Sequence, residues 1–293
     1  MKLGWIVNAL LLAAVIGLGA YAWHKGNQPK EPSHLLSTLS PSAVRKIEVT
    51  RRDGAGYTLE KRDENWFLTS PLEVRADQSQ VQRLLDLLAA TSKEKLAATD
   101  LKRFDLDPPA VKVTLDNQVF SFGTTNPLTQ EQYLATGDSV YLVSSYYLSL
   151  IPTQGDRLFT HNLFHQNEKP VSFAFKDFRV EQKDGKWSVM PAPAEKEGPS
   201  QDDFNRWADD WRLSSSLLTQ VWDGKATSET VQVKLADGKS VVFAVVRKEP
   251  ELVLARPDEK VQFQFSGEMS RTLMHPPAVV AKDAKEKAGA GAS

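Results

Sequence analysis

The sequence predicts an α+β fold of two tandem duplicated modules, each an antiparallel sheet with one main helix, behind an N-terminal transmembrane helix. Three observations support this prediction. Short segments with alternating apolar residues fill most of the chain, and two amphipathic helical stretches interrupt them. The order of these segments also repeats, since "EKRDENWFL" at residues 60–68 returns as "EQKDGKWSV" at residues 181–189. The interval between these two copies is too long for the repeat of a solenoid. We therefore expect a duplicated domain, and the alternative is one larger α+β domain.

Length and composition exclude several classes of protein. The 293 residues suffice for two domains, and 41% hydrophobic and 25% charged residues are typical of a globular protein. A net charge of −1 argues against a nucleic-acid binder, which needs a basic surface to displace counterions. The chain has no cysteine, which excludes thiol catalysis, disulfides and cysteine zinc sites.

The N-terminus predicts export. Residues 4–23 carry no charge and are about long enough to cross a bilayer as a helix. Trp5 at one end and Tyr21 with Trp23 at the other are typical of interfacial anchors. We expect a cytoplasmic stub at residues 1–3 and a transmembrane anchor at 4–23. The alternative is a signal peptide cleaved after Ala22.

The first module follows a tether. Residues 24–43 are rich in proline, serine and polar residues, and are predicted to be a linker. Residues 44–158 form the first module, in which alternation predicts a meander over 44–68 and strands at 111–115, 119–122, 132–136 and 140–144. Between them, a helix is predicted from the apolar spacing of Val81, Leu84, Leu85 and Leu88. Asp77 is its expected N-cap, with Gln80 completing a capping box.

The second module repeats this order. Residues 159–170 are the expected connector and 171–275 the second module, with strands at 171–175, 178–182, 187–190, 231–235, 241–245 and 261–265. Ser200 is predicted to cap a helix with Asp203 at its third position, and that helix buries Phe204, Trp207 and Trp211. Trp66 and Trp187 are expected to be equivalent core residues. The tail, residues 276–293, has no apolar face and is predicted to be disordered.

Candidate chemistry is limited to one histidine pair. His161 and His165 have the spacing of metal ligands, because residues i and i+4 point the same way on a helix. The metalloprotease pattern requires glutamate after the first histidine, and Asn162 occupies that position. A third ligand is not apparent, although Asp156, Glu168 or Asp177 are in range along the chain. We therefore favour a connector with two half-exposed histidines, and predict no metal ligand, no catalytic residue and no cofactor.

Several segments resemble a known family. The stretch from Ile47 through "WFLTSP", "ADQSQVQRLLDLL" and "FDLDPP" is similar to the bacterial membrane-anchored family called domain of unknown function 4340. Asp105 stands where that family often has glycine. The resemblance covers residues 46–160 and implies an envelope protein, often encoded near ABC-type transporters of the gliding-motility kind, with no catalytic residues to transfer. The residues that match the family pattern are Trp66, Pro71, Ala76, Asp77, Leu84, Leu85, Leu106, Asp107 and Pro109.

The function expected from these observations is that of a non-catalytic accessory or scaffold protein. It would be a single-pass protein of the bacterial inner membrane with most of the chain in the periplasm, binding a transporter or another envelope component. Two alternatives belong to other classes. One is a metal-dependent hydrolase that uses His161 and His165, and the other is a periplasmic carrier of a small ligand.

The uncharged N-terminal segment makes a prediction about topology. A reporter that is active only outside the cytoplasm, fused after Ser293, is expected to be active, because residues 4–23 direct the chain across the membrane. The control is the same fusion lacking residues 1–30. Activity of a cytoplasm-only reporter at the same position would contradict the prediction.

Overall fold

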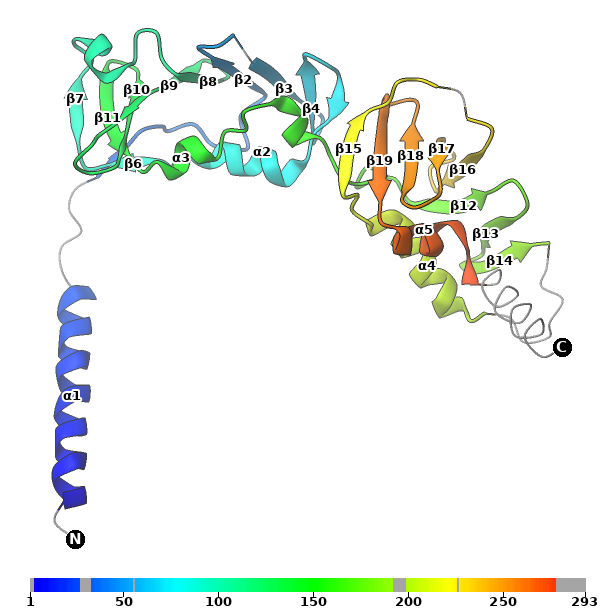
Figure 1. Ribbon diagram of the computed structural model, residues 1–293, viewed down its shortest axis with the longest axis horizontal. Coiled ribbons are helices and arrows are strands. Elements are labelled where there is room, and N and C mark those ends of the chain that lie inside the picture. Colours follow the sequence, from blue (N-terminus) through cyan, green and yellow to red (C-terminus); the bar gives the residue numbers. More distant parts are fainter. Residues whose placement is uncertain (1–2, 27–32, 55, 192–198, 226, 278–293) are drawn as a thin grey trace.

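The computed structural model describes residues 3–26, 33–54, 56–191, 199–225 and 227–277. It is a mixed α/β structure dominated by two antiparallel sheets, with few helices (Figure 1). Helix α1 (Leu3–Gly26) covers the segment expected to be an anchor. In the described part of the chain, no helix combines the length and the apolar character that a membrane span requires. The anchor therefore stays a prediction, and all but two residues of the expected tail lie outside the described residues.

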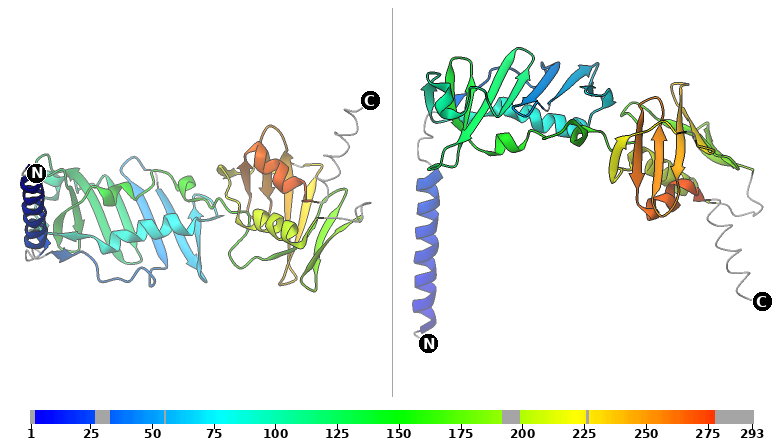
Figure 2. Two further views of the ribbon diagram at one scale, coloured as in Figure 1. Left: turned by 90° about the horizontal axis from the view of Figure 1, so that it is seen from below. Right: turned by 45° about the horizontal axis from the view of Figure 1, so that its top comes forward.

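The first sheet has nine strands, and every neighbouring pair in it is antiparallel. Helix α2 (Gln78–Leu85) and the 3-10 helix η1 (Asp86–Ala89) lie across one face of it (Figure 2). The short helix α3 (Tyr146–Ser149) follows its last long strand. In spatial order the strands are β5 (Val74–Arg75), β4 (Asn65–Ser70), β3 (Gly56–Arg62), β2 (Lys46–Arg51), β8 (Val111–Leu115), β9 (Gln118–Thr125), β10 (Gln132–Thr136), β11 (Ser139–Val143) and β7 (Lys95–Ala97).

Part of the expected linker packs on this sheet. Strand β1 (His34–Leu35) pairs with β6 (Thr91–Ser92), and the Ser37 hydroxyl donates to Gln118 Oε1 at 2.6 Å. The side chain of Leu36 is buried. Burial of one leucine and one serine gives this segment fixed partners, so only the earlier residues of 24–43 remain candidates for a tether.

The second sheet has eight strands, also all antiparallel, with helices α4 (Gln201–Leu213) and α5 (Gly267–Met274) on one face. Strand β18 was not predicted, because all five of its residues are buried and it therefore lacks the polar–apolar alternation of a half-exposed strand. The order is β14 (Lys186–Met190), β13 (Arg179–Lys183), β12 (Pro170–Ala174), β16 (Thr230–Leu235), β17 (Ser240–Arg247), β18 (Leu252–Arg256), β19 (Val261–Phe265) and β15 (Leu218–Val221).

The two sheets share one strand order. Starting from β4 in the first sheet and β14 in the second, strands with the same place in the chain occupy the same place in the sheet. Trp66 lies in β4 and Trp187 in β14, and both side chains are buried in the core, as expected. The last strand in each order, β7 or β15, is an outer strand with one unpaired edge.

A glutamine side chain links strand to helix in the same way in both sheets. Gln78, the first residue of α2, accepts from the Trp66 backbone N–H at 3.1 Å and donates to the Trp66 carbonyl. Gln201, the first residue of α4, accepts from the Trp187 N–H at 2.7 Å and donates to its carbonyl at 3.0 Å. Each amide binds both the backbone donor and the backbone acceptor of the tryptophan, and the Trp66 carbonyl also accepts from the Ala76 N–H at 2.9 Å. We call this contact the glutamine clamp.

Helix caps agree only partly with expectation. Asp77 accepts from the backbone N–H groups of Ser79 and Gln80, so it is an N-cap. The predicted capping box is wrong here, because the Asp77 N–H donates to the Leu158 carbonyl at 2.7 Å and leaves Gln80 no reciprocal partner. Ser200 and Asp203 do form both halves of a capping box.

Burial of the repeated tryptophans makes a prediction about stability. Trp187→Ala is expected to cost about 3–5 kcal/mol in unfolding free energy, because it removes a large aromatic side chain from a packed core. Leu128→Ala, at a position that is 91% exposed, is the control and should stay within about 0.5 kcal/mol of the parent. Urea unfolding of both variants measures the difference. Equal midpoints would show that Trp187 is not a core residue.

Candidate functional site

The connector between the sheets is partly buried and pairs with both of them. Phe159 forms an antiparallel bridge with Ala76 at the edge of the first sheet. Further along, Asn162 bridges Ser215, which precedes β15 of the second sheet. Leu163 is fully buried. The connector therefore packs through part of its length and touches both sheets, while Asn162, Gln166, Asn167 and Lys169 stay exposed.

Two buried arginines hold the connector in place. Arg75, in β5 of the first sheet, donates to the carbonyls of Asn162 and Phe164, each at 2.8 Å. Arg256, the last residue of β18 in the second sheet, donates to the Leu163 carbonyl at 2.7 Å. Both side chains are at most 5% exposed. Each sheet therefore supplies one cation that binds the backbone of the same short segment.

Two glutamates neutralise these arginines. Arg75 Nε lies 3.1 Å from both carboxylate oxygens of Glu259, which belongs to the turn between β18 and β19. Arg256 forms a bidentate salt bridge with Glu168 of the connector, with nitrogen–oxygen distances of 2.7 and 2.8 Å. His165 Nε2 also lies 3.0 Å from Glu259 Oε1. We call Arg75, His165, Glu168, Arg256 and Glu259 the junction cluster.

The electrostatics of the cluster keep its carboxylates ionised. Burial alone would raise the pKa of Glu259, but the hydrogen bond from His165 and the charges of Arg75 and Arg256 outweigh it and hold the pKa at about 2. Burial likewise opposes ionisation of Glu168, and its hydrogen bond and charge pairing with Arg256 lower the pKa below the ordinary value. Carboxylates that stay ionised in this way favour a structural role for the cluster. Proton transfer would require a pKa near the working pH.

The histidine pair does not lie on a helix. Residues 161–165 are not helical, so His161 and His165 lack the i, i+4 alignment that a metal site of that kind requires, and both are partly exposed, as the favoured connector predicts. His161 Nδ1 lies 3.0 Å from the Ser216 carbonyl, whereas His165 belongs to the junction cluster. Glu168, one of the possible third ligands, is paired with Arg256. Among the described residues, no group of three or more histidine, aspartate or glutamate side chains is placed to hold a metal ion.

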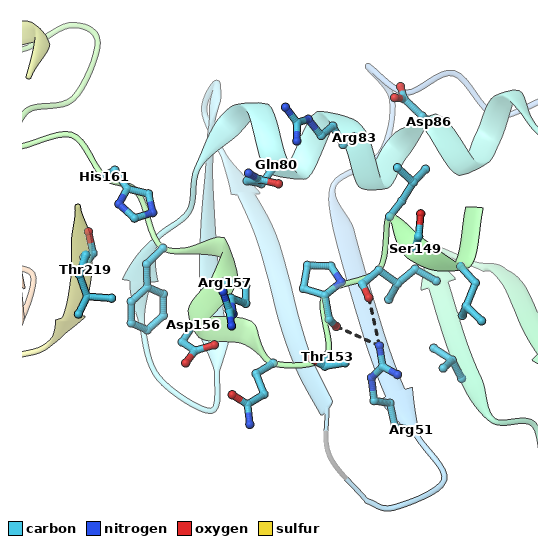
Figure 3. A pocket seen from close by; sticks show the side chains of 18 of the residues that line it. Arg51, Gln80, Arg83, Asp86, Ser149, Thr153, Asp156, Arg157, His161 and Thr219 are labelled. Carbon is cyan, nitrogen blue, oxygen red and sulfur yellow. Dashed lines mark hydrogen bonds between the residues drawn. The ribbon is translucent and has the colours of Figure 1, made fainter. Parts of the chain in front are cut away.

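An open cleft of about 1670 Å³ lies beside the connector (Figure 3). Its walls come from α2 and residues 146–159 of the first sheet's side and from β15 of the second sheet. Thr219 stands on one side of the view, and Asp156, Arg157 and Arg51 stand on the other. The cleft is thus shared between the two sheets, and the junction cluster fixes the separation of its walls.

The charged lining of the cleft has an excess of arginine. Arg51 donates to the carbonyls of Ile151 and Pro152, each at 3.1 Å, and its buried Nε has no partner among the described residues. No carboxylate in the described part of the chain pairs with Arg83 or Arg157. Two aspartates of the lining, Asp86 and Asp156, oppose these three arginines.

Sequence reasoning found the connector and its histidines but missed Arg75, Arg256 and Glu259. One signal was present for Arg256, which ends the apolar run "LVLAR", where a charge at the end of a buried strand requires a partner. Nothing in the sequence indicated that this partner would come from the connector.

Comparison with known proteins gives one family. The profile of a family described as a domain of unknown function, DUF4340, matches residues 66–257. This match begins at Trp66 in β4 and continues past β18, so it reaches much further into the second sheet than the expected 46–160. No curated protein and no solved structure matches the chain.

Ionisation of Glu259 predicts a specific loss of stability in acid. A pKa lowered from 4.5 to about 2 in the folded state contributes about 3 kcal/mol of stability above pH 4.5, which disappears as the pH falls towards 2. In Glu259→Gln this acid-dependent loss should shrink by about that amount, while stability at pH 7 falls because two buried arginines lose a counter-charge. Urea unfolding between pH 7 and pH 2 measures both effects.

The control for this experiment is Glu94→Gln, which removes an exposed carboxylate of the first sheet. It should show the same pH dependence as the parent. A Glu259→Gln variant that also follows the parent at every pH would show that Glu259 does not stabilise the junction.

Proposed function

The chain belongs to the DUF4340 family, and from that premise we propose that it is a non-catalytic accessory or scaffold protein of the bacterial envelope. In this proposal residues 4–23 anchor it in the inner membrane and the two sheets lie in the periplasm. There it binds a transporter, with an ABC transporter as the first candidate, or another envelope component.

The observation that carries this proposal is the cleft between the sheets. Pockets for small molecules usually measure about 300–1,000 Å³ and are mainly apolar. The cleft here measures about 1670 Å³, is open, and mixes arginine, aspartate and threonine with apolar residues. These properties favour a protein partner over a small ligand held between the sheets. The junction cluster supports this view, because it presents both walls in a fixed arrangement.

Anchoring is supported by the surface of α1. Its side chains carry no charge over residues 4–23. Leu11, Leu12, Val15, Ile16 and Leu18 are each at least 60% exposed. An apolar surface of that extent, uncovered by other described residues, is favourable in lipid.

We also propose that the two sheets arose by duplication. Their common strand order supports this origin, and so does the glutamine clamp, which uses the first residue of the helix in both cases. A duplicated unit provides two similar surfaces, and the cleft lies where the outer strand of one copy faces the helix of the other.

The proposal is tested by crosslinking in intact cells. A photoreactive amino acid at Gln220, an exposed residue of β15 that lines the cleft, is expected to give one predominant adduct with an envelope protein. Leu128, exposed on the first sheet and outside the cleft, is the matched control position and should give little or none. Identical adducts at both positions, or none at Gln220, would refute binding through the cleft.

A further inference from the structure

Strand β15 is the outermost strand of the second sheet, on the side nearest the first sheet (Figure 1), and its residues line the cleft. It pairs with β19 on one side, with Val221 opposite Val261. Its other edge lines the cleft, together with the loop that carries Asp156 and Arg157 (Figure 3). An outer strand with an open edge exposes unpaired backbone N–H and C=O groups, which are able to bind a further strand.

The register decides which backbone groups face the cleft. The Trp222 N–H donates to the Lys260 carbonyl at 2.9 Å, so residue 222 points towards β19. Backbone groups alternate between the two edges of an antiparallel strand. The backbone N–H and C=O of Gln220 therefore also point towards β19. Those of Thr219 and Val221 point to the opposite edge of the strand, towards the cleft.

The connector already occupies the start of this edge. The Ser216 N–H donates to the His161 carbonyl at 2.8 Å, next to the bridge between Asn162 and Ser215. Thr160 still contacts this edge, because its carbonyl accepts from the hydroxyl of the buried Thr219 at 2.8 Å. Before Thr160 the connector leaves the edge, because Phe159 pairs instead with Ala76 of the first sheet. Among the described residues no backbone bond continues the pairing along Thr219 and Val221. The open edge is therefore the continuation of an intramolecular strand pairing.

The side chains around this edge suggest the composition of what binds there. Three apolar side chains near this edge are exposed: Leu217 by 65%, Leu218 by 42% and Val221 by 50%. The strand "LTQV" itself carries no charge. The facing wall supplies the arginine excess, and no carboxylate of the described residues pairs with Arg157. Apolar side chains at alternate positions would pack beside the strand, and carboxylates would pair with the arginines.

We propose that the open edge of β15 binds an extended segment of the partner protein by strand addition, and that this segment alternates apolar and acidic residues. The inference rests on the proposed function, since it names the mode in which the scaffold holds its partner. Main-chain bonds to the exposed Val221 supply the affinity, and the arginines of the opposite wall select acidic segments.

The test uses the full chain in detergent micelles and a labelled peptide, Glu-Val-Glu-Val-Glu-Val, followed by fluorescence anisotropy. Saturable binding is expected, and the peptide with lysine in place of glutamate should bind about tenfold more weakly. Two isomers, N-methylated on either the three glutamates or the three valines, block opposite edges of the peptide. One isomer should bind like the parent and the other about tenfold more weakly, because only one edge pairs with β15.

A protein variant provides the complementary measurement. Val221→Pro removes an N–H that faces the cleft and leaves the bonds to β19 in place, which an outer strand tolerates. It should weaken binding about tenfold. Ala97→Pro is the matched control: it lies in β7, the corresponding outer strand of the first sheet, where the Ala98 N–H bonds to Asp138 and residue 97 therefore faces outwards. This variant should bind the peptide like the parent.

Other outcomes overturn the inference. Equal affinity of the two methylated isomers, or no binding of the parent peptide, would exclude strand addition, and this holds even if Val221→Pro fails to fold. A chain that is dimeric in micelles and becomes monomeric in Val221→Pro would show that the edge binds a second copy instead. Crosslinking from Gln220 that persists when strand addition has failed would leave the scaffold function in place with another binding mode.

Discussion

The arrangement of this protein depends on the burial of two arginines between two sheets. Moving a guanidinium from water into the interior costs several kcal/mol, and the cost is recovered only when hydrogen bonds and counter-charges are complete. Arg75 and Arg256 meet that requirement with three connector carbonyls and two glutamates. Arg75 of the first sheet is satisfied only when both the connector and Glu259 of the second sheet are in place, and Arg256 is satisfied only when the connector supplies Leu163 and Glu168. The cluster thus stabilises one relative placement of the sheets.

That placement determines which surfaces stay open. The connector pairs with the first sheet at Phe159 and with the second at Asn162, so it covers only the beginning of the β15 edge. The remainder of β15 faces α2 and Arg157 across the cleft. A looser connector would leave this edge as an unprotected outer strand, which is an aggregation hazard in a free sheet. Here the first sheet lies opposite it and restricts access to a narrow segment.

The repeated glutamine clamp shows how local sequence supports each sheet. In both sheets the helix begins with glutamine and its amide binds the backbone of the buried tryptophan. The contact fixes the start of the helix against the sheet independently of the side chains that pack below it.

Asp105 illustrates a similar local rule. Its backbone is left-handed with φ of 58°, a conformation that glycine adopts freely and that aspartate tolerates. An aspartate at this position therefore suits a tight turn.

The sequence by itself determined that the chain forms antiparallel strands with one main helix in each half, because period-two and helical patterns, caps and turns act over a few residues; it did not predict β15 or helix α5 of the second sheet. It placed Trp66 and Trp187 in equivalent strands and placed the connector between the sheets. It did not predict β18, whose buried residues show no alternation, or the docking of Leu36 on the first sheet. The junction cluster was decided only by tertiary structure, because Arg75 and Glu259 are far apart in the chain and nothing local identifies them as partners. The same holds for the edge of β15, since whether an outer strand is covered or open depends on where the other sheet lies.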